Sequence, residues 1–134
     1  MKQRTKPPHF LLIMLLFTLF SCTQFENNEP CLDFQLTTPI TGEHRVKINT
    51  SRTFTYEILN NCNTYATLLY VKIDGENKTE FRVEGITEPG EILENGQTFS
   101  IIFTPRTAGD KKATIFIKTE VVDFVFYMNG TGIH

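Results

Sequence analysis

Segments in which apolar and polar residues alternate recur along most of the chain, and this pattern constrains the fold more than any other feature. Successive side chains of a β-strand point to opposite faces of a sheet, so a period of two predicts strands with one buried face. A short segment at 46–48 predicts an edge strand. The remaining predicted strands lie at residues 32–36, 52–60, 67–73, 81–83, 98–104, 112–119 and 122–129.

Turn-forming residues separate these segments. Asp74-Gly75, Pro89-Gly90 and Asn95-Gly96 are dipeptides typical of turns. The segments between them are rich in Thr, Phe, Ile and Val, which favour strands, and none has the period of an amphipathic helix. Short strands at steady spacing predict an all-β fold, an immunoglobulin-like antiparallel β-sandwich of about seven strands, in residues 31–134.

The first residues have the features of an export signal. Lys2, Arg4 and Lys6 precede an almost unbroken apolar run over residues 10–20. A bilayer-spanning helix needs about 20 apolar residues, so this run is too short for one. A charged start, a short apolar stretch and a small residue before the break are typical of a secretory signal peptide, which we predict for residues 1–21.

The break itself reads Leu19-Phe20-Ser21-Cys22, which resembles the lipobox of bacterial lipoproteins of the Bacteroidetes type. The resemblance implies cleavage before Cys22 and lipidation of that cysteine, with residues 22–30 as lipidated cysteine and tether. Phe20 departs from the small or aliphatic residue usual at its position, so simple signal cleavage and an uncleaved anchor stay open. Thr23 stands where some bacteria use Asp for inner-membrane retention, so we expect a lipid-anchored envelope protein at the outer membrane.

The other two cysteines suggest a disulfide. If Cys22 carries lipid, Cys31 and Cys62 remain, and an oxidising compartment favours their pairing. Cys31 begins the first predicted strand and Cys62 follows the second core strand, ends that antiparallel neighbours would bring together. The alternatives are a metal site or a reactive thiol, but no histidine lies near either cysteine and the chain has no Cys-x-x-Cys.

Several motifs, in the same order as in the family, resemble the immunoglobulin-like domains of the Hydin and choice-of-anchor D group. The family's Asn-x-Gly turn reads Asn60-Asn61-Cys62 here, which is a departure. The resemblance implies the fold and a role as spacer, scaffold or binding module, with no shared catalytic residues. The matching segments are residues 52–60, 81–83, 92–99, 103–115 and 130–132.

The sequence offers little for catalysis. His44 is the only histidine between the signal and the last residue, and no serine lies in a Gly-x-Ser-x-Gly context. The acidic stretch from Glu84 to Glu94 matches no ordered calcium loop. We therefore expect no enzyme activity, no catalytic residues, no metal and no cofactor.

Charge excludes one class of partner. Residues 1–21 hold three of the 13 Lys and Arg and no acidic residue, which leaves ten basic and 15 acidic residues and a net charge of −5. Nucleic acid is therefore not expected as a partner of the folded domain. We expect the membrane, through the lipid anchor, and a protein partner in the envelope.

One predicted surface suits such a partner. In this type of sandwich the third, sixth and seventh core strands share a sheet. In the strand predicted at residues 67–73, we expect Leu69, Val71 and Ile73 to point inward. A large exposed apolar patch usually marks a contact, although cross-strand packing under a loop or the tether is the alternative. The outward residues of the three strands are Leu68, Tyr70, Phe116, Val125 and Tyr127.

These features predict a non-enzymatic, membrane-anchored binding, adhesion or scaffold module of an envelope complex. A glycan-binding surface lipoprotein is an alternative, weakened by the lack of Trp. A regulator that inserts residues 84–97 into an envelope enzyme also stays open, as does an assembly factor that pairs through an exposed edge strand.

Overall fold

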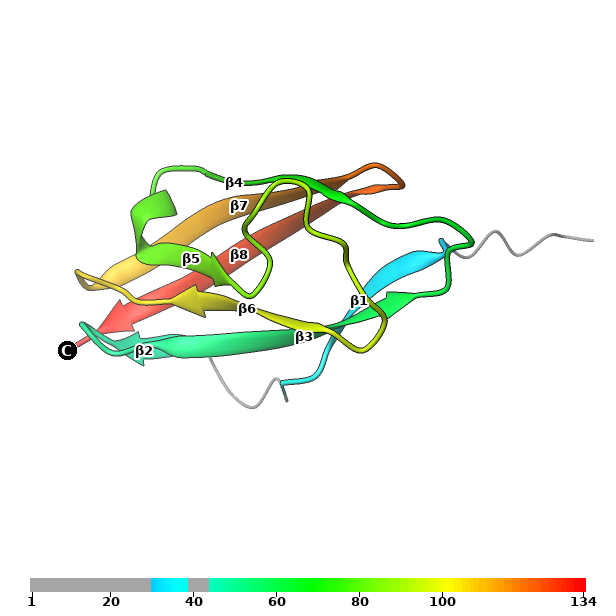
Figure 1. The fold of residues 1–134 in the computed structure, drawn as a ribbon. Coiled ribbons are helices and arrows are strands. Elements are labelled where there is room, and N and C mark those ends of the chain that lie inside the picture. Colours follow the sequence, from blue (N-terminus) through cyan, green and yellow to red (C-terminus); the bar gives the residue numbers. More distant parts are fainter. Residues whose placement is uncertain (1–29, 39–43) are drawn as a thin grey trace, which may run out of the picture.

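The computed structural model describes residues 30–38 and 44–134, which form two four-stranded sheets packed face to face (Figure 1). The predicted signal peptide and Cys22 lie outside the described residues. One sheet has the strand order β1 (Leu32–Leu36), β3 (Arg52–Asn60), β6 (Thr98–Phe103) and β5 (Phe81–Glu84). The other has the order β2 (Arg45–Lys47), β8 (Asp123–Ile133), β7 (Gly109–Thr119) and β4 (Leu68–Asp74).

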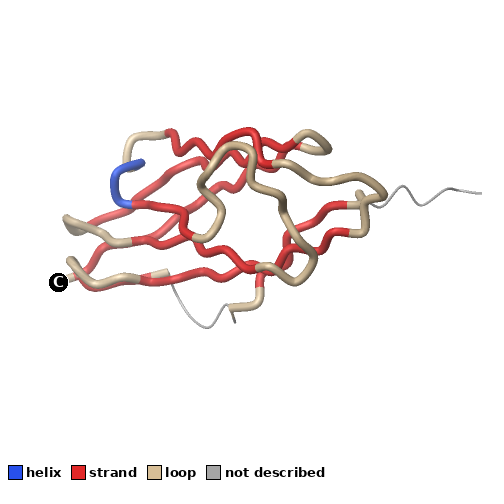
Figure 2. The backbone as a smooth tube through the Cα atoms, in the orientation of Figure 1, coloured by secondary structure: helices blue, strands red, loops and turns tan. Residues whose placement is uncertain are grey.

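The predicted all-β sandwich is confirmed. The two strand orders correspond to the two sheets of an immunoglobulin constant-type domain, with β2 added beside the last strand. The sandwich has eight strands rather than about seven, and β2 pairs parallel with β8, so one sheet is mixed rather than antiparallel. Strands make up most of the described backbone, and the longest described loop joins β5 to β6 (Figure 2).

The period-two pattern correctly identifies the core. Phe54, Tyr56 and Ile58 of β3 are buried, as are Phe99 and Ile101 of β6. Aromatic rings join the two sheets through this core. The rings of Phe34 and Phe124 stack with centroids 4.0 Å apart, and the Tyr56 ring meets that of Phe126 edge-on at 5.1 Å. Burial raises the pKa of the Tyr56 hydroxyl.

The prediction for β4 is wrong at its first two residues. Leu68 is fully buried and Leu69 is exposed, the reverse of the expectation. The cause is a bulge between Leu68 and Tyr70 where β4 pairs with β7. A bulge inserts one residue, and a shift of one residue exchanges the two faces of a strand.

At the end of the sandwich that holds the C-terminus, β8 packs unusually close to the other sheet. A Cβ on Gly130 would overlap the ring of Phe103, and a Cβ on Gly132 would overlap the carbonyl oxygen of Thr107. Both glycines face the core, with Thr131 between them on the other face. Close packing therefore explains the two glycines of the Gly130-Thr131-Gly132 motif, since only glycine fits at either position.

The same end contains a buried ion pair. Lys111 Nζ lies 3.6 Å from Glu80 Oε2, and each side chain is only 8% exposed. Lys111 also donates to Thr107 Oγ1 at 2.6 Å, while Glu80 Oε1 accepts the Arg106 N–H at 2.8 Å. Glu80 ends a 3-10 turn before β5 and Lys111 lies in β7, so the pair connects the two sheets.

Candidate functional site

The outer face of the sheet formed by β4, β7 and β8 is the first candidate site. Its three strands share a sheet, as predicted, and Tyr70, Val125 and Tyr127 are 45%, 44% and 78% exposed. Phe116 is only half-buried and lies between Lys72 and Val125 in the register. Four of the five residues predicted for this surface therefore share one face.

The fifth predicted residue, Leu68, does not belong to this face, because the bulge turns it into the core. The same bulge exposes Leu69, which is 38% exposed and which the sequence pattern placed inside. We define the apolar face as the four outward residues that remain. They are Tyr70, Phe116, Val125 and Tyr127.

Charged residues lie among the residues of the apolar face, because Lys118 lies opposite Tyr70 and Lys72 lies opposite Phe116 in the register. Lys118 Nζ lies 3.3 Å from Asp123 Oδ2, and Lys72 Nζ lies 3.6 Å from Asp74 Oδ2. The Gly75 N–H donates to Asp74 and, together with Lys72, lowers the pKa of that carboxyl group. Exposed pairs of this kind contribute about 0–1 kcal/mol to stability. The face therefore offers apolar and charged side chains together, as protein interfaces commonly do.

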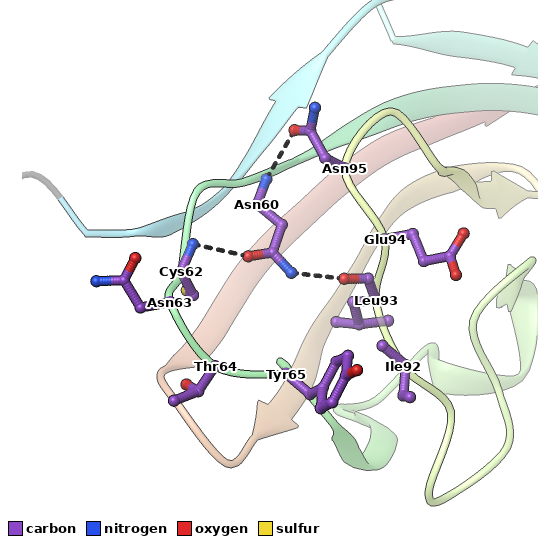
Figure 3. Close-up of a pocket in the computed structure, with 9 residues that line it drawn as sticks. All are labelled: Asn60, Cys62, Asn63, Thr64, Tyr65, Ile92, Leu93, Glu94 and Asn95. Atoms are coloured by element: carbon purple, nitrogen blue, oxygen red, sulfur yellow. Dashed lines mark hydrogen bonds between the residues drawn. The ribbon is translucent and has the colours of Figure 1, made fainter.

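A groove of about 710 Å³ near the disulfide is the second candidate site. Figure 3 shows the Asn60 side chain between the two loops that form it. Asn60 Nδ2 donates to the Leu93 carbonyl at 2.7 Å, and Asn60 Oδ1 accepts the Cys62 N–H at 3.0 Å. The Asn60 N–H donates to Asn95 Oδ1 at 3.0 Å. These bonds fix residues 60–65 against residues 92–95 and keep the groove open between them.

The groove is lined by apolar and polar groups together. Tyr65 is 76% exposed and Ile92 is 44% exposed, and the two side chains lie side by side in Figure 3. The sequence predicted the Asn95-Gly96 turn on one side of the groove but not the groove itself. Its two walls are separated by about 30 residues in the chain, and they are joined by the bonds of Asn60 and by the Leu93 N–H, which donates to the Ala66 carbonyl at 2.9 Å.

The predicted disulfide is present in the structure. Cys31 and Cys62 are bonded, with their Cα atoms 4.8 Å apart. The register explains the pairing, because Leu32 of β1 lies opposite Asn60 of β3 and the Asn61 N–H donates to the Cys31 carbonyl at 2.7 Å, so Cys62 lies one residue beyond the position opposite Cys31. Cys62 also lines the groove, so the bond holds one groove wall to β1.

The histidine and the acidic residues singled out in the sequence do not gather into a site. His44 is exposed, with its ring 5.9 Å from that of Phe54. Of the acidic stretch, Glu84 bonds to Arg82 and Glu91 accepts from Gln97. Among residues 30–38 and 44–134, no group of three or more His, Cys, Asp or Glu could hold a metal ion. The same residues include no helix long and apolar enough to cross a membrane.

Comparisons with known proteins show similarity in fold and no similarity in sequence to a known family. No protein-family model matches the chain, and no curated protein matches it in sequence. A solved structure of a conjugative transposon lipoprotein from Bacteroides eggerthii is similar, with a TM-score of 0.53 and 14% identity over 76% of this chain and 98% of that one. Domains 4 and 5 of the S-layer protein SbsC give a TM-score of 0.44 at 14% identity, over 79% of this chain and about half (54%) of that one.

Proposed function

We propose that this protein is a non-enzymatic, lipid-anchored module that binds a protein partner in a bacterial envelope complex. The apolar face carries this proposal. It presents Tyr70, Val125 and Tyr127 to solvent on a sheet face that also carries two exposed charged pairs. Exposed aromatic side chains among charged groups suit a protein contact, where aromatic residues contribute most of the binding energy.

The anchor is proposed on separate grounds. The sequence around Cys22 resembles a lipobox, and the similar structure from Bacteroides eggerthii is described as a lipoprotein. The Cys31–Cys62 disulfide agrees with export to an oxidising compartment. Thr23 after the cysteine supports the outer membrane as the address, and the motif order in residues 52–132 supports a Hydin-like or choice-of-anchor D grouping.

Mass spectrometry of the mature protein tests the anchor. We expect an acylated amino-terminal Cys22, and we expect Cys22→Ser to release the protein from the membrane fraction. An unmodified Cys22 in a membrane-free protein would exclude the lipoprotein part of the proposal and leave a secreted sandwich.

A co-purification comparison tests the partner face in the full-length chain. We expect Tyr70→Ser with Tyr127→Ser to lose a specific envelope partner that the unaltered chain retains. Tyr65→Ser is the matched control, because it removes an equally exposed tyrosine from the groove instead. Loss of the same partner in both variants, or in neither, contradicts a role for the apolar face.

A glycan ligand is the second candidate function, and the groove favours it. An exposed tyrosine beside Asn side chains and Thr64 offers ring stacking and hydrogen bonds to a sugar. A glycan array should then show binding that Tyr65→Ala abolishes and that Tyr127→Ser leaves unchanged. Activity assays of envelope enzymes with and without the protein test whether it is instead a regulator that acts through residues 84–97.

A further inference from the structure

Most of β8 has no neighbour on one side among the described residues. β2 pairs only with Thr131–Ile133, which leaves Asp123–Asn129 beyond its end (Figure 1). The Thr131 N–H donates to the His44 carbonyl at 2.8 Å, so the backbone N–H and C=O of Thr131 point toward β2, away from β7. Backbone groups alternate along a strand, so those of every second residue point the same way. The residues concerned are Asp123, Val125, Tyr127 and Asn129.

Among the described residues, the other sheet edges are each covered or interrupted at some point, and the β8 edge is not. On β1, Asp33 Oδ1 accepts the outward Phe34 N–H at 2.8 Å. On β4, Leu68 exchanges two backbone hydrogen bonds of 2.8 Å with the loop at Gly90 and Glu91. β5 has only four residues. Proteins usually protect an edge strand in such ways, because an open edge pairs with other chains. No described residue protects the β8 edge from Asp123 to Asn129.

The side chains along this edge are apolar on both faces of the sheet. Val125 and Tyr127 are exposed on the outer face. Phe124 and Phe126 face the core but are only half-buried, because β8 lies at the border of the sandwich there. A strand that pairs with this edge must therefore present apolar side chains on both of its own faces.

We infer that the partner strand is β8 of a second copy of this chain, paired antiparallel about a two-fold axis at Phe126. This register places Val125 opposite Tyr127 of the second copy, and Asp123 opposite Asn129. Apolar residues meet apolar residues on the outer face, and no like charges face each other. On the inner face, Phe126 meets its own symmetry mate, and Phe124 meets Met128.

The register is fixed by the number of backbone groups that it satisfies. Centred on Phe126, it pairs all four residues that point outward, and each forms two hydrogen bonds across an antiparallel pair. A register centred on Val125 leaves Asn129 without a partner, and one centred on Tyr127 leaves Asp123 without one. A self-complementary patch of this kind is what a two-fold dimer requires.

Cysteine cross-linking of the full-length chain in intact cells tests the register. Asp123 and Asn129 are exposed and would face each other across the dimer. Cα atoms of such a pair lie about 5.5 Å apart, within the range that a disulfide needs. The double variant Asp123→Cys with Asn129→Cys should therefore shift from the monomer band to the dimer band on a non-reducing gel.

The two single variants are the matched controls. A cysteine at position 123 alone would lie about 20 Å from its symmetry mate, six residues along the strand, so neither single variant should form the dimer. Co-expression of the two single variants with different tags should restore a mixed dimer. Peptide mapping should show that Cys31–Cys62 stays intact in every sample.

Three outcomes would overturn the inference. They are a double variant that stays monomeric, single variants that dimerise as strongly as the double one, and a double variant that cross-links to a different protein. Amide hydrogen exchange of the unaltered chain gives a second measurement without any substitution. Exchange at Val125 and Tyr127 should slow as the protein concentration rises, and exchange that does not depend on concentration contradicts the dimer. Tyr127 belongs both to the apolar face and to this edge, so Tyr70→Ser alone, on β4 and outside the edge, tests the partner of the apolar face separately.

Discussion

The two ends of the sandwich are held together in different ways. Near the groove, the Cys31–Cys62 disulfide connects β1 and β3, which belong to the same sheet. At the other end, the Glu80–Lys111 pair connects the two sheets, and Gly132 lets β8 approach the Thr107 carbonyl. The first end contains a groove with an exposed tyrosine. At the second end, which we call the closed end, a buried ion pair and close packing hold the two sheets together.

This difference separates stability from recognition. A bond within one sheet holds the groove wall without closing the gap between the loops, so the groove stays accessible. Contacts between the sheets at the other end fix the spacing of the sheets, and none of the residues that line the groove takes part in them. Substitutions at the closed end should therefore reduce stability alone, whereas substitutions at the groove end should also change the groove.

The largest effect should come from Lys111→Met at the closed end. It leaves the Glu80 carboxylate buried with only the Arg106 N–H as a partner, because Glu80 Oε2 has no hydrogen bond within the described residues. Removing one member of a buried pair costs about 3–5 kcal/mol. Denaturant unfolding should show this loss, with the groove unaffected.

Lys72→Met is the control for this prediction, since Lys72 pairs with Asp74 at a side-chain exposure of 62%. It should cost well under about 1 kcal/mol. The double variant Glu80→Gln with Lys111→Met should recover part of the loss, because it leaves no buried charge. Equal effects of Lys111→Met and Lys72→Met would show that the buried pair does not hold the sheets.

The second-largest loss of stability should come from removing the disulfide at the groove end. Replacing Cys31 and Cys62 by Ala releases a loop with a sequence separation of 31 residues. In the chain-entropy model this costs about 3–4 kcal/mol of unfolding free energy. Hydrogen exchange should also become faster at the backbone amide of position 62, which donates to Asn60 Oδ1, and not at the Arg106 amide. Equal acceleration at both amides would contradict a separation between the two ends.

The sequence predicted the strands well because burial on one face imposes a period of two. It predicted the disulfide because strand ends and cysteines coincide. It could not predict the bulge at Leu68, since one inserted residue leaves the local composition unchanged. It could not predict the Glu80–Lys111 pair either, because charged residues in a turn and at a strand start are usually solvated. The groove depends on hydrogen bonds of Asn60 to a distant loop, which no local pattern encodes.

A smaller effect is expected from Gly132→Ala. The new methyl group would overlap a backbone oxygen, which can move only if the loop at Thr107 moves. Overpacking of this kind costs about 1–3 kcal/mol. Gly130→Ala should cost less, because a ring rather than the backbone must shift. Thr131→Ala between them is the control and should lose only its exposed bond to Asp110. A Gly132→Ala protein as stable as the control would mean that the closed end is not tightly packed.

The smallest effect concerns an exposed charge at the closed end, in contrast to the buried charges there. The Gly75 N–H and Lys72 lower the pKa of Asp74, so the folded state binds a proton at this carboxyl group less readily than the unfolded chain does. Asp74 therefore adds stability above its unfolded pKa of about 3.9, and this contribution is lost as the pH falls through the lower folded value. Asp74→Asn should thus reduce unfolding free energy slightly at pH 7 and not at strongly acidic pH. Glu76→Gln, at the exposed neighbour, is the control. A difference between Asp74→Asn and the unaltered protein that persists in strong acid would show that the carboxylate charge is not its cause. In that case the Gly75 turn itself, rather than the charge, would stabilise this end of β4.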